Sequence, residues 1–195
     1  MDNRALVYLA ENRILETERL LLRPMTMDDL LDYHEYTSDG ELLKYDYPEH
    51  QSIEESRESL VLYNLSAPLG RYGIELKSEG KLIGNISLRI DTEQETAEIG
   101  YTVNANYHRK GYATEAALAL KELAQNMPRI KIFLAHTTKP NLASQGLLEK
   151  IGMTLMWEKA GLSLRGEPTI RLRYESKLKN DEKEESGTKR FQFLK

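Results

Sequence analysis

Apolar and polar residues alternate along several short stretches of the chain, which is the pattern of half-buried β-strands. One further stretch is a nearly continuous apolar run, as expected of a strand covered on both faces. The expected strands are 18–25, 72–76, 82–90, 95–103, 130–135, 153–159 and 169–176. Residues 78–81 predict a hairpin between the second and third strands, and Gly161 and Gly166 mark the loop before the last one.

Apolar residues recur at helical spacing between these strands. Thr26 precedes two aspartates and a helical face that includes Tyr33, so a helix should begin there. Ser52 and Glu55 resemble a capping box, and Asn141 is placed to cap a later helix. The expected helices are a short one within 5–14, one that follows Thr26, and 52–64, 113–126 and 141–150.

The order of these elements predicts an α/β (α+β) fold. The helix over 113–126 links two strands as a crossover, so those strands should be parallel neighbours in a mixed sheet with helices on both faces. We expect an N-terminal extension (1–16), one domain (17–176) and a charged tail (177–195). An exposed edge strand near 169–176 would support a homodimer, and both a monomer and a homodimer remain open.

The stretch from Ala97 to Thr114 combines a strand, a basic loop and the start of a helix. Apolar residues such as Ile99 lie on one face of the strand, and Glu98 is the single carboxylate on the other. The helix begins directly after Gly111. Backbone N–H groups of such a loop and the N-terminus of the helix form a site for a phosphate group.

Composition narrows the classes of function. The 195 residues are 40% hydrophobic and 30% charged, as in a globular protein, and the net charge of −4 argues against direct nucleic-acid binding. The chain has no cysteine, which excludes disulfides and a cysteine nucleophile. The histidines lack metal-ligand spacing, and no segment resembles a signal peptide or a membrane span. We therefore expect no metal, no membrane partner and a cytoplasmic location.

Three segments together resemble the GNAT acyltransferase superfamily, and more closely its RimJ/RimL-type branch of ribosomal-protein N-terminal acetyltransferases. They are 16–24 (ETERLLLRP), 97–116 (AEIGY through RKGYATEA) and 141–153 (NLAS through EKIGM). The resemblance implies a three-layer fold with a sheet of about six to seven strands, splayed between the fourth and fifth (97–103 and 130–136). It also implies acetyl-CoA as donor and an amine as acceptor.

The resemblance further implies where the cofactor lies. Gly111 and Ala113 match the family's loop pattern, whereas His108 stands where the family has Gln or Arg, and Arg109 is placed to supply that charge. Asn141 would contact the pantetheine amides, and a backbone N–H near Tyr101 would stabilise the tetrahedral intermediate. The implied cofactor-binding residues are Tyr101, Val103, His108, Arg109, Lys110, Gly111, Tyr112, Ala113, Thr114 and Asn141.

Two side chains are candidates for the chemistry of acetyl transfer. A protonated amine cannot attack a thioester, so a base is needed, and Glu98, on the polar face of the strand that leads into the phosphate loop, is the best candidate. The alternative is that Glu98 is an ordinary solvated carboxylate. Many relatives protonate the leaving thiolate with a tyrosine, but that position is Leu148 here, which leaves Ser144 as the nearby hydroxyl. His136 ends a buried strand and is interpreted as a core histidine.

The acceptor amine stays open among several classes. The branch that the chain resembles favours a protein N-terminal α-amine, and a polyamine or an aminoglycoside is the alternative small-molecule acceptor. A second class is a CoA-binding regulatory module without turnover, because Leu148 and His108 depart from the family pattern. Activity of a Glu98→Gln variant would distinguish the enzyme from the binding module.

Overall fold

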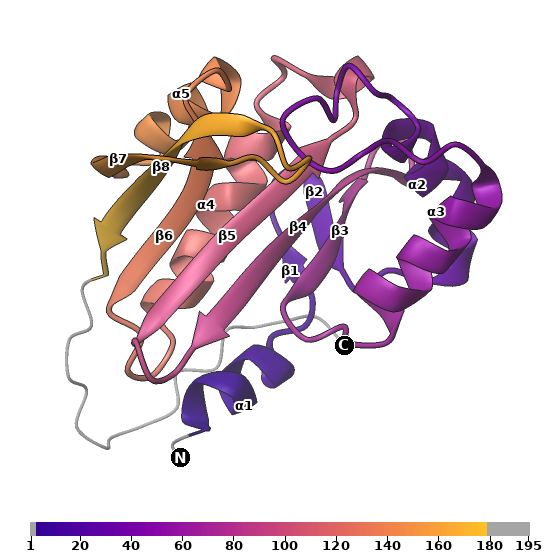
Figure 1. Ribbon diagram of the computed structural model, residues 1–195. Coiled ribbons are helices and arrows are strands. Elements are labelled where there is room, and N and C mark those ends of the chain that lie inside the picture. Colours follow the sequence, from indigo (N-terminus) through magenta and orange to yellow (C-terminus); the bar gives the residue numbers. More distant parts are fainter. Residues whose placement is uncertain (1–2, 179–195) are drawn as a thin grey trace.

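The computed structural model describes residues 3–178, which form one mixed sheet with helices on both faces (Figure 1). The sheet has eight strands in the order β1-β2-β3-β4-β5-β6-β8-β7. Their bounds are β1 (Leu15–Glu16), β2 (Leu20–Arg23), β3 (Arg71–Leu76), β4 (Lys81–Asp91), β5 (Thr96–Val103), β6 (Ile132–Thr138), β7 (Thr154–Leu162) and β8 (Pro168–Lys177). The α/β class expected from the sequence is confirmed, with one or two strands more than expected.

The helices begin close to where the caps predict. The bounds are α1 (Arg4–Glu11), α2 (Leu30–Thr37), α3 (Ile53–Leu60), α4 (Tyr112–Gln125) and α5 (Leu142–Lys150), with short helical turns at Met27–Asp29, Val61–Leu65 and Ala105–Tyr107. The hydroxyl of Ser52 accepts a hydrogen bond from the N–H of Glu55, which caps α3. The carboxylate of Glu55 accepts from the N–H of Gln51 at 2.6 Å and not from that of Ser52, so only the Ser52 half of the expected capping box is as predicted.

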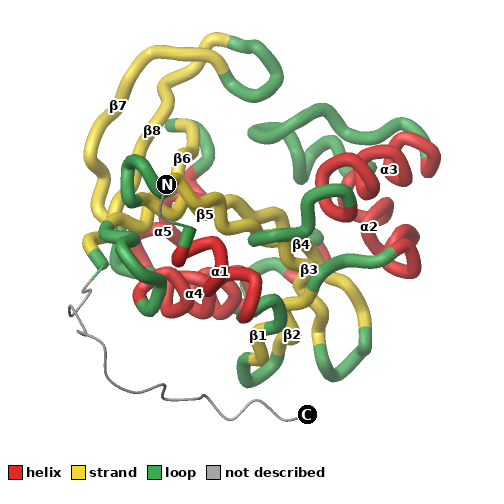
Figure 2. The backbone as a smooth tube through the Cα atoms, turned by 90° about the horizontal axis from the view of Figure 1, so that it is seen from below, coloured by secondary structure: helices red, strands yellow, loops and turns green. Residues whose placement is uncertain are grey.

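Two apolar cores lie on opposite faces of the sheet, and Figures 1 and 2 show α4 and α5 on one side and α2 and α3 on the other. The larger core packs side chains of α1 and α4, such as Leu9 and Leu120, against the sheet. The smaller core packs Tyr33, Tyr36 and Leu60 against Leu82 of β4. Burial on both faces gives the expected three layers.

Strands β5 and β6 are parallel neighbours, as the crossover helix predicts. They pair from Thr96 opposite Ile132 to Glu98 opposite Leu134, and the pairing stops there. Both strands continue for several residues, so the sheet opens into a V beyond Glu98. We call this opening the splay. It lies between the two strands for which it was expected, and these are the fifth and sixth strands because the short strand β1 precedes the first expected strand.

The order of the last two strands differs from the sequence-based expectation. Strand β8 lies between β6 and β7, so β7 is the edge strand and the expected edge at 169–176 is wrong. Periodicity reports burial along a strand, and it carries no information on which neighbour a returning strand joins. Gly161 also lies within β7, opposite Thr169, so only Gly166 is in the loop. A Cβ at Gly161 would lie 2.9 Å from Cδ of Arg171, which favours glycine at this position.

Both ends of the described chain contact the sheet. Helix α1 buries Ala5 and Leu9, and Leu15–Glu16 pair with β2 in the segment expected to be an extension. Strand β8 ends at Lys177 and Leu178 is buried, whereas the rest of the expected tail lies outside the described residues. No helix within residues 3–178 is long and apolar enough to cross a bilayer.

Candidate active site

The backbone of β5 presents free polar groups to the splay. The N–H of Asn104 donates to the carbonyl of Ile83 at 2.8 Å, so the residue that follows β5 is hydrogen-bonded toward β4. Because peptide groups of neighbouring residues in a strand point in opposite directions, the N–H groups of Tyr101 and Val103 point away from β4. Strand β6 has already diverged at this level. These groups can therefore bind an extended ligand lying in the splay.

The loop between β5 and α4 forms a nest of N–H groups. Arg109 and Gly111 have positive φ angles of 59° and 86°, and Gly111 is the N-terminal cap of α4. Within residues 3–178, the N–H groups of residues 109–114 donate to no protein acceptor. Unpaired N–H groups at a helix N-terminus are an anion site, so the loop fits the diphosphate of a nucleotide.

The turn between β1 and β2 holds this loop from one side. Arg19 donates from Nε to the carboxylate of Glu115 at 2.7 Å and from Nη1 to the carbonyl of Lys110 at 2.9 Å. The hydroxyl of Thr17 donates to the same carboxylate at 2.6 Å, and the Arg19 guanidinium lies over the ring of Tyr112. The first strand of the family motif is thus the anchor of the phosphate loop, a contact that spacing along the sequence does not predict.

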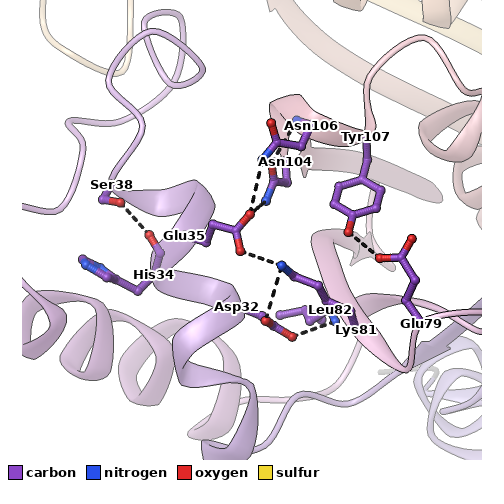
Figure 3. A network of polar contacts seen from close by, with 10 residues as sticks. All are labelled: Asp32, His34, Glu35, Ser38, Glu79, Lys81, Leu82, Asn104, Asn106 and Tyr107. Atoms are coloured by element: carbon purple, nitrogen blue, oxygen red, sulfur yellow. Dashed lines mark hydrogen bonds and ion pairs between the residues drawn. The ribbon is translucent and has the colours of Figure 1, made fainter.

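Helix α2 holds the loop from the other side (Figure 3). Oε1 of Glu35 accepts from Nδ2 of Asn104 at 2.8 Å and, at 3.4 Å, from Nδ2 of Asn106. Oε2 of Glu35 accepts from Lys81 at 2.6 Å, and the hydroxyl of Tyr107 donates to Glu79 at 2.6 Å. The turn that precedes the phosphate loop is therefore fixed to α2 and to the β3–β4 hairpin.

The basic residues expected at the phosphate loop have different surroundings. The ring nitrogen Nε2 of His108 lies 2.7 Å from the carbonyl oxygen of Val103, so this side chain points back to the end of β5. Nζ of Lys110 lies 5.0 Å from the centre of the Tyr107 ring, and Arg109 is exposed. The candidate anion site is therefore formed by main-chain N–H groups of residues 109–114, and the His108 side chain points away from it.

Glu98 lies where the splay begins, in the last rung that β5 shares with β6. Its Oε1 accepts from Nη2 of Arg89 at 2.7 Å and lies 3.1 Å from Nδ1 of His136. Burial raises the pKa of Glu98, but the hydrogen bond to His136 and the charge of Arg89 outweigh it, and the net pKa is lowered. The carboxylate is therefore ionised at neutral pH. His136, interpreted from the sequence as a core histidine, is half-buried and contacts this carboxylate.

Ser144 and Tyr101 form a second polar pair at the splay. Asn141 caps α5 by accepting from the N–H of Ser144 at 3.1 Å, which fixes the first turn of the helix. The hydroxyl of Ser144 lies 3.0 Å from that of Tyr101, and burial raises the pKa of Tyr101 to about 12. Leu148 is fully buried. A tyrosine hydroxyl therefore does reach this region, from the strand rather than from the helix.

Two loops meet above the splay, as Figure 1 shows for the β7–β8 hairpin and the segment before α3. Nη2 of Arg165, at the hairpin tip, donates to the carbonyls of Leu43 and Tyr47 at 3.3 and 3.2 Å and to Glu49 at 3.0 Å. We call this contact the Arg165 bridge. Asp46 lies in the bridged loop, and burial raises its pKa to about 6 while the charge of Arg165 lowers it only in part. Its carboxylate accepts no hydrogen bond within residues 3–178.

The structure thus brings the sequence-predicted residues together around one opening. Glu98 and Tyr101 are an odd number of residues apart on β5, so they face opposite sides of the sheet. The anion nest of 109–114 follows at the end of the same strand. Among the described residues, no group of three or more His, Asp or Glu side chains is placed to hold a metal ion.

Comparisons with known proteins agree with this geometry. The sequence model of the family described as "Acetyltransferase (GNAT) domain" matches residues 19–154. The chain is 34% identical over 139 residues to "Uncharacterized N-acetyltransferase YnaD" of Bacillus subtilis, covering 71% of this chain and 81% of that protein. It is 31% identical over 156 residues to "Uncharacterized N-acetyltransferase p20" of Bacillus licheniformis, covering 75% and 88%.

Solved structures show the same fold. A GNAT-family acetyltransferase from Bacillus anthracis superposes with a TM-score of 0.76 at 29% identity, covering 84% of this chain and 98% of that one. RimL, a ribosomal L7/L12 alpha-N-protein acetyltransferase solved with coenzyme A, superposes with a TM-score of 0.74 at 21% identity, covering 85% and 98%.

Proposed function

Because the chain belongs to the GNAT acetyltransferase family and is an acyltransferase, we propose that it transfers the acetyl group of acetyl-CoA to a primary amine by direct attack. The observation that carries the proposal is the set of unpaired N–H groups of residues 109–114 beside the splay. They would hold the diphosphate, and Asn141 with the main chain of Tyr101 and Val103 would hold the pantetheine arm.

The side chains at the splay would serve the transfer step. Acetyl-CoA supplies a thioester carbonyl carbon that a neutral amine can attack. Glu98, ionised at neutral pH, is placed to receive the proton of the amine through water. One hydroxyl of the Tyr101–Ser144 pair would accept from the other and donate its own hydrogen bond to the departing sulfur, and a backbone N–H of β5 would stabilise the oxyanion.

We favour a protein N-terminal α-amine as acceptor, in line with the RimJ/RimL-type motif at 16–24. The charges of the loop that Arg165 contacts, which contains Asp46 and Glu49, favour an acceptor with a single ammonium group. Glu49 is neutralised there by Arg165, whereas Asp46 is half-buried with no hydrogen bond from the described residues. A polyamine or an aminoglycoside would call for several free carboxylates. A soluble enzyme acting on such amines would work in the cytoplasm.

The test is a screen of acceptors with acetyl-CoA and a readout of free thiol. The panel contains peptides with different N-terminal residues, putrescine, spermidine and kanamycin. We expect turnover with peptide α-amines and a loss of kcat of about 10²- to 10⁴-fold in Glu98→Gln. Glu93→Gln, on the exposed turn after β4, is the matched control. Binding of acetyl-CoA without turnover of any amine would support a regulatory module instead.

A further inference from the structure

The Glu98–His136 pair occupies one face of the sheet where the two parallel strands separate. Glu98 is opposite Leu134 in the last rung, and His136 is two residues further along β6, so both side chains project to the same face. Nδ1 of His136 lies 3.1 Å from Oε1 of Glu98, and each side chain is 25% exposed. The pair is therefore positioned across the start of the splay and is partly removed from water.

The contact determines which nitrogen of His136 carries the proton. An ionised carboxylate only accepts hydrogen bonds, so Nδ1 must be the donor. In a neutral imidazole with a proton on Nδ1, the other nitrogen has a free lone pair. Nε2 of His136 makes no hydrogen bond within residues 3–178. The pair thus presents an unprotonated nitrogen at the splay.

An imidazole is better suited than a carboxylate to remove the proton of the attacking amine. A general base is most effective when its pKa lies near the working pH, and ordinary values are about 6.5 for histidine and about 4.3 for glutamate. The arginine on β4 binds the same oxygen of Glu98 as His136 does, which stabilises the charged carboxylate and weakens it as a base. A carboxylate behind an imidazole fixes its tautomer and stabilises the imidazolium.

The other charged groups around the pair do not compete for Nε2. Arg173 is opposite His136 in β8, but its Nε donates to Glu175 at 2.6 Å. The ring of Trp157 lies 5.8 Å from that of His136, and Nζ of Lys159 lies over the same indole. The charged groups that face the pair from neighbouring strands are Arg89 (β4), Lys159 (β7), and Arg173 and Glu175 (β8).

We propose that Nε2 of His136 receives the proton of the attacking amine, directly or through one water, and that Glu98 acts as its carboxylate partner. This inference rests on the proposed function and refines the role of Glu98 in it. The C–N bond forms as the carbonyl π electrons move to oxygen, and the amine proton passes to Nε2. The carbonyl then re-forms as the C–S bond breaks, and the sulfur leaves with the electron pair. Solvent returns that proton to the thiolate.

The kinetic test uses the full chain with acetyl-CoA and alaninamide as the α-amine probe. We expect His136→Gln to lower kcat by about 10²- to 10⁴-fold with the KM for acetyl-CoA unchanged. Free imidazole should restore activity to His136→Ala in proportion to its unprotonated fraction. His34→Gln on α2, whose ring contacts Ser56, is the control.

A second readout does not depend on turnover. In ¹⁵N spectra of the four histidines, the signal of His136 is identified as the one that is absent from His136→Gln. We expect this signal to show that Nδ1 carries the proton. In Glu98→Gln the preference for the Nδ1-protonated tautomer should disappear. A proton on Nε2 of His136, or a wild-type kcat in His136→Gln, would overturn the inference while leaving acetyl transfer intact. A wild-type enzyme that acetylates no amine would overturn the proposed function and this inference together.

Discussion

The hydroxyl of Tyr101 lies 3.0 Å from the hydroxyl of Ser144, and this contact joins β5 to α5 across the splay. On the opposite face of the sheet, Glu98 contacts His136 in the same way. Each face of the opening therefore has a polar pair: Tyr101–Ser144 joins β5 to α5, and Glu98–His136 joins β5 to β6. The Tyr101–Ser144 pair consists of two hydroxyls and contains no carboxylate or imidazole that could take a proton from the amine. It is therefore better suited to donate a hydrogen bond to the leaving sulfur.

Tyr101→Phe should lower kcat by about 10- to 100-fold, the value of a hydrogen bond to a charged group. Ser144→Ala should have a smaller effect of the same kind, and the double variant should lose little beyond Tyr101→Phe because the two hydroxyls act together. Steady-state kinetics with saturating acetyl-CoA measure this. Tyr174→Phe, which loses a hydroxyl bonded to Glu149, is the control. Full additivity of the two changes would show that the hydroxyls act separately.

Gly111→Ala should weaken acetyl-CoA binding. The φ of +86° at Gly111 is costly for any residue with a Cβ, by about 1–2 kcal/mol, and an added Cβ would lie 3.3 Å from Nη2 of Arg19. Gly80→Ala is a matched control because Gly80 has a φ of +60° with open space around it. Calorimetry should show an increase in the Kd of acetyl-CoA for Gly111→Ala alone, whereas both variants lose stability. Equal Kd values would place the diphosphate elsewhere.

Asp46→Asn should stabilise the protein at pH 8 and not at pH 3.5. The pKa of Asp46 is raised from 3.8 to about 6 in the folded state, mainly by burial. Because the folded state then binds more protons than the unfolded state, stability falls as pH rises through the window from about 4 to 6. The cost above that window is up to about 3 kcal/mol. Urea unfolding across pH 3.5–8 measures it, and a gain independent of pH would contradict the assignment.

Glu35→Gln should loosen the turn before the phosphate loop. Glu35 binds Asn104, Asn106 and Lys81, so loss of its charge weakens the contacts that fix this turn to α2. We expect a few-fold higher KM for acetyl-CoA with kcat little changed. Glu41→Gln, whose ion pair with Lys44 is on the surface, is the control. A changed kcat with an unchanged KM would show that α2 acts on the acceptor instead.

The local parts of the fold and site could be predicted from the sequence. The strand ending at Val103, the glycine at the start of α4 and the Asn141 cap each depend on neighbouring residues, and each lies where its pattern indicates. The position of Glu98 at the splay follows from the alternation of β5 together with the parallel crossover. Periodicity, caps and turn residues all act within a few positions along the chain.

The contacts between distant segments could not be predicted in this way. His136 lies at the end of an apolar run, and only the stop of pairing at Glu98 brings its ring to the carboxylate. The Tyr101–Ser144 contact depends on the angle at which α5 leaves β6. The position of β8 inside the sheet depends on the return path of the last hairpin. None of these leaves a signal in residue spacing.

The Arg165 bridge has a consequence for how new substrate preferences arise in such an enzyme. The two segments that it joins come from opposite ends of the domain, and neither contributes to the nest at 109–114. Under the proposed function, replacement of the bridged loops would alter which amine is accepted and would leave the proposed diphosphate site unchanged. The Arg165 guanidinium and its carbonyl partners hold these two loops together, so the loops could vary in sequence while the segment 109–114 stays the same.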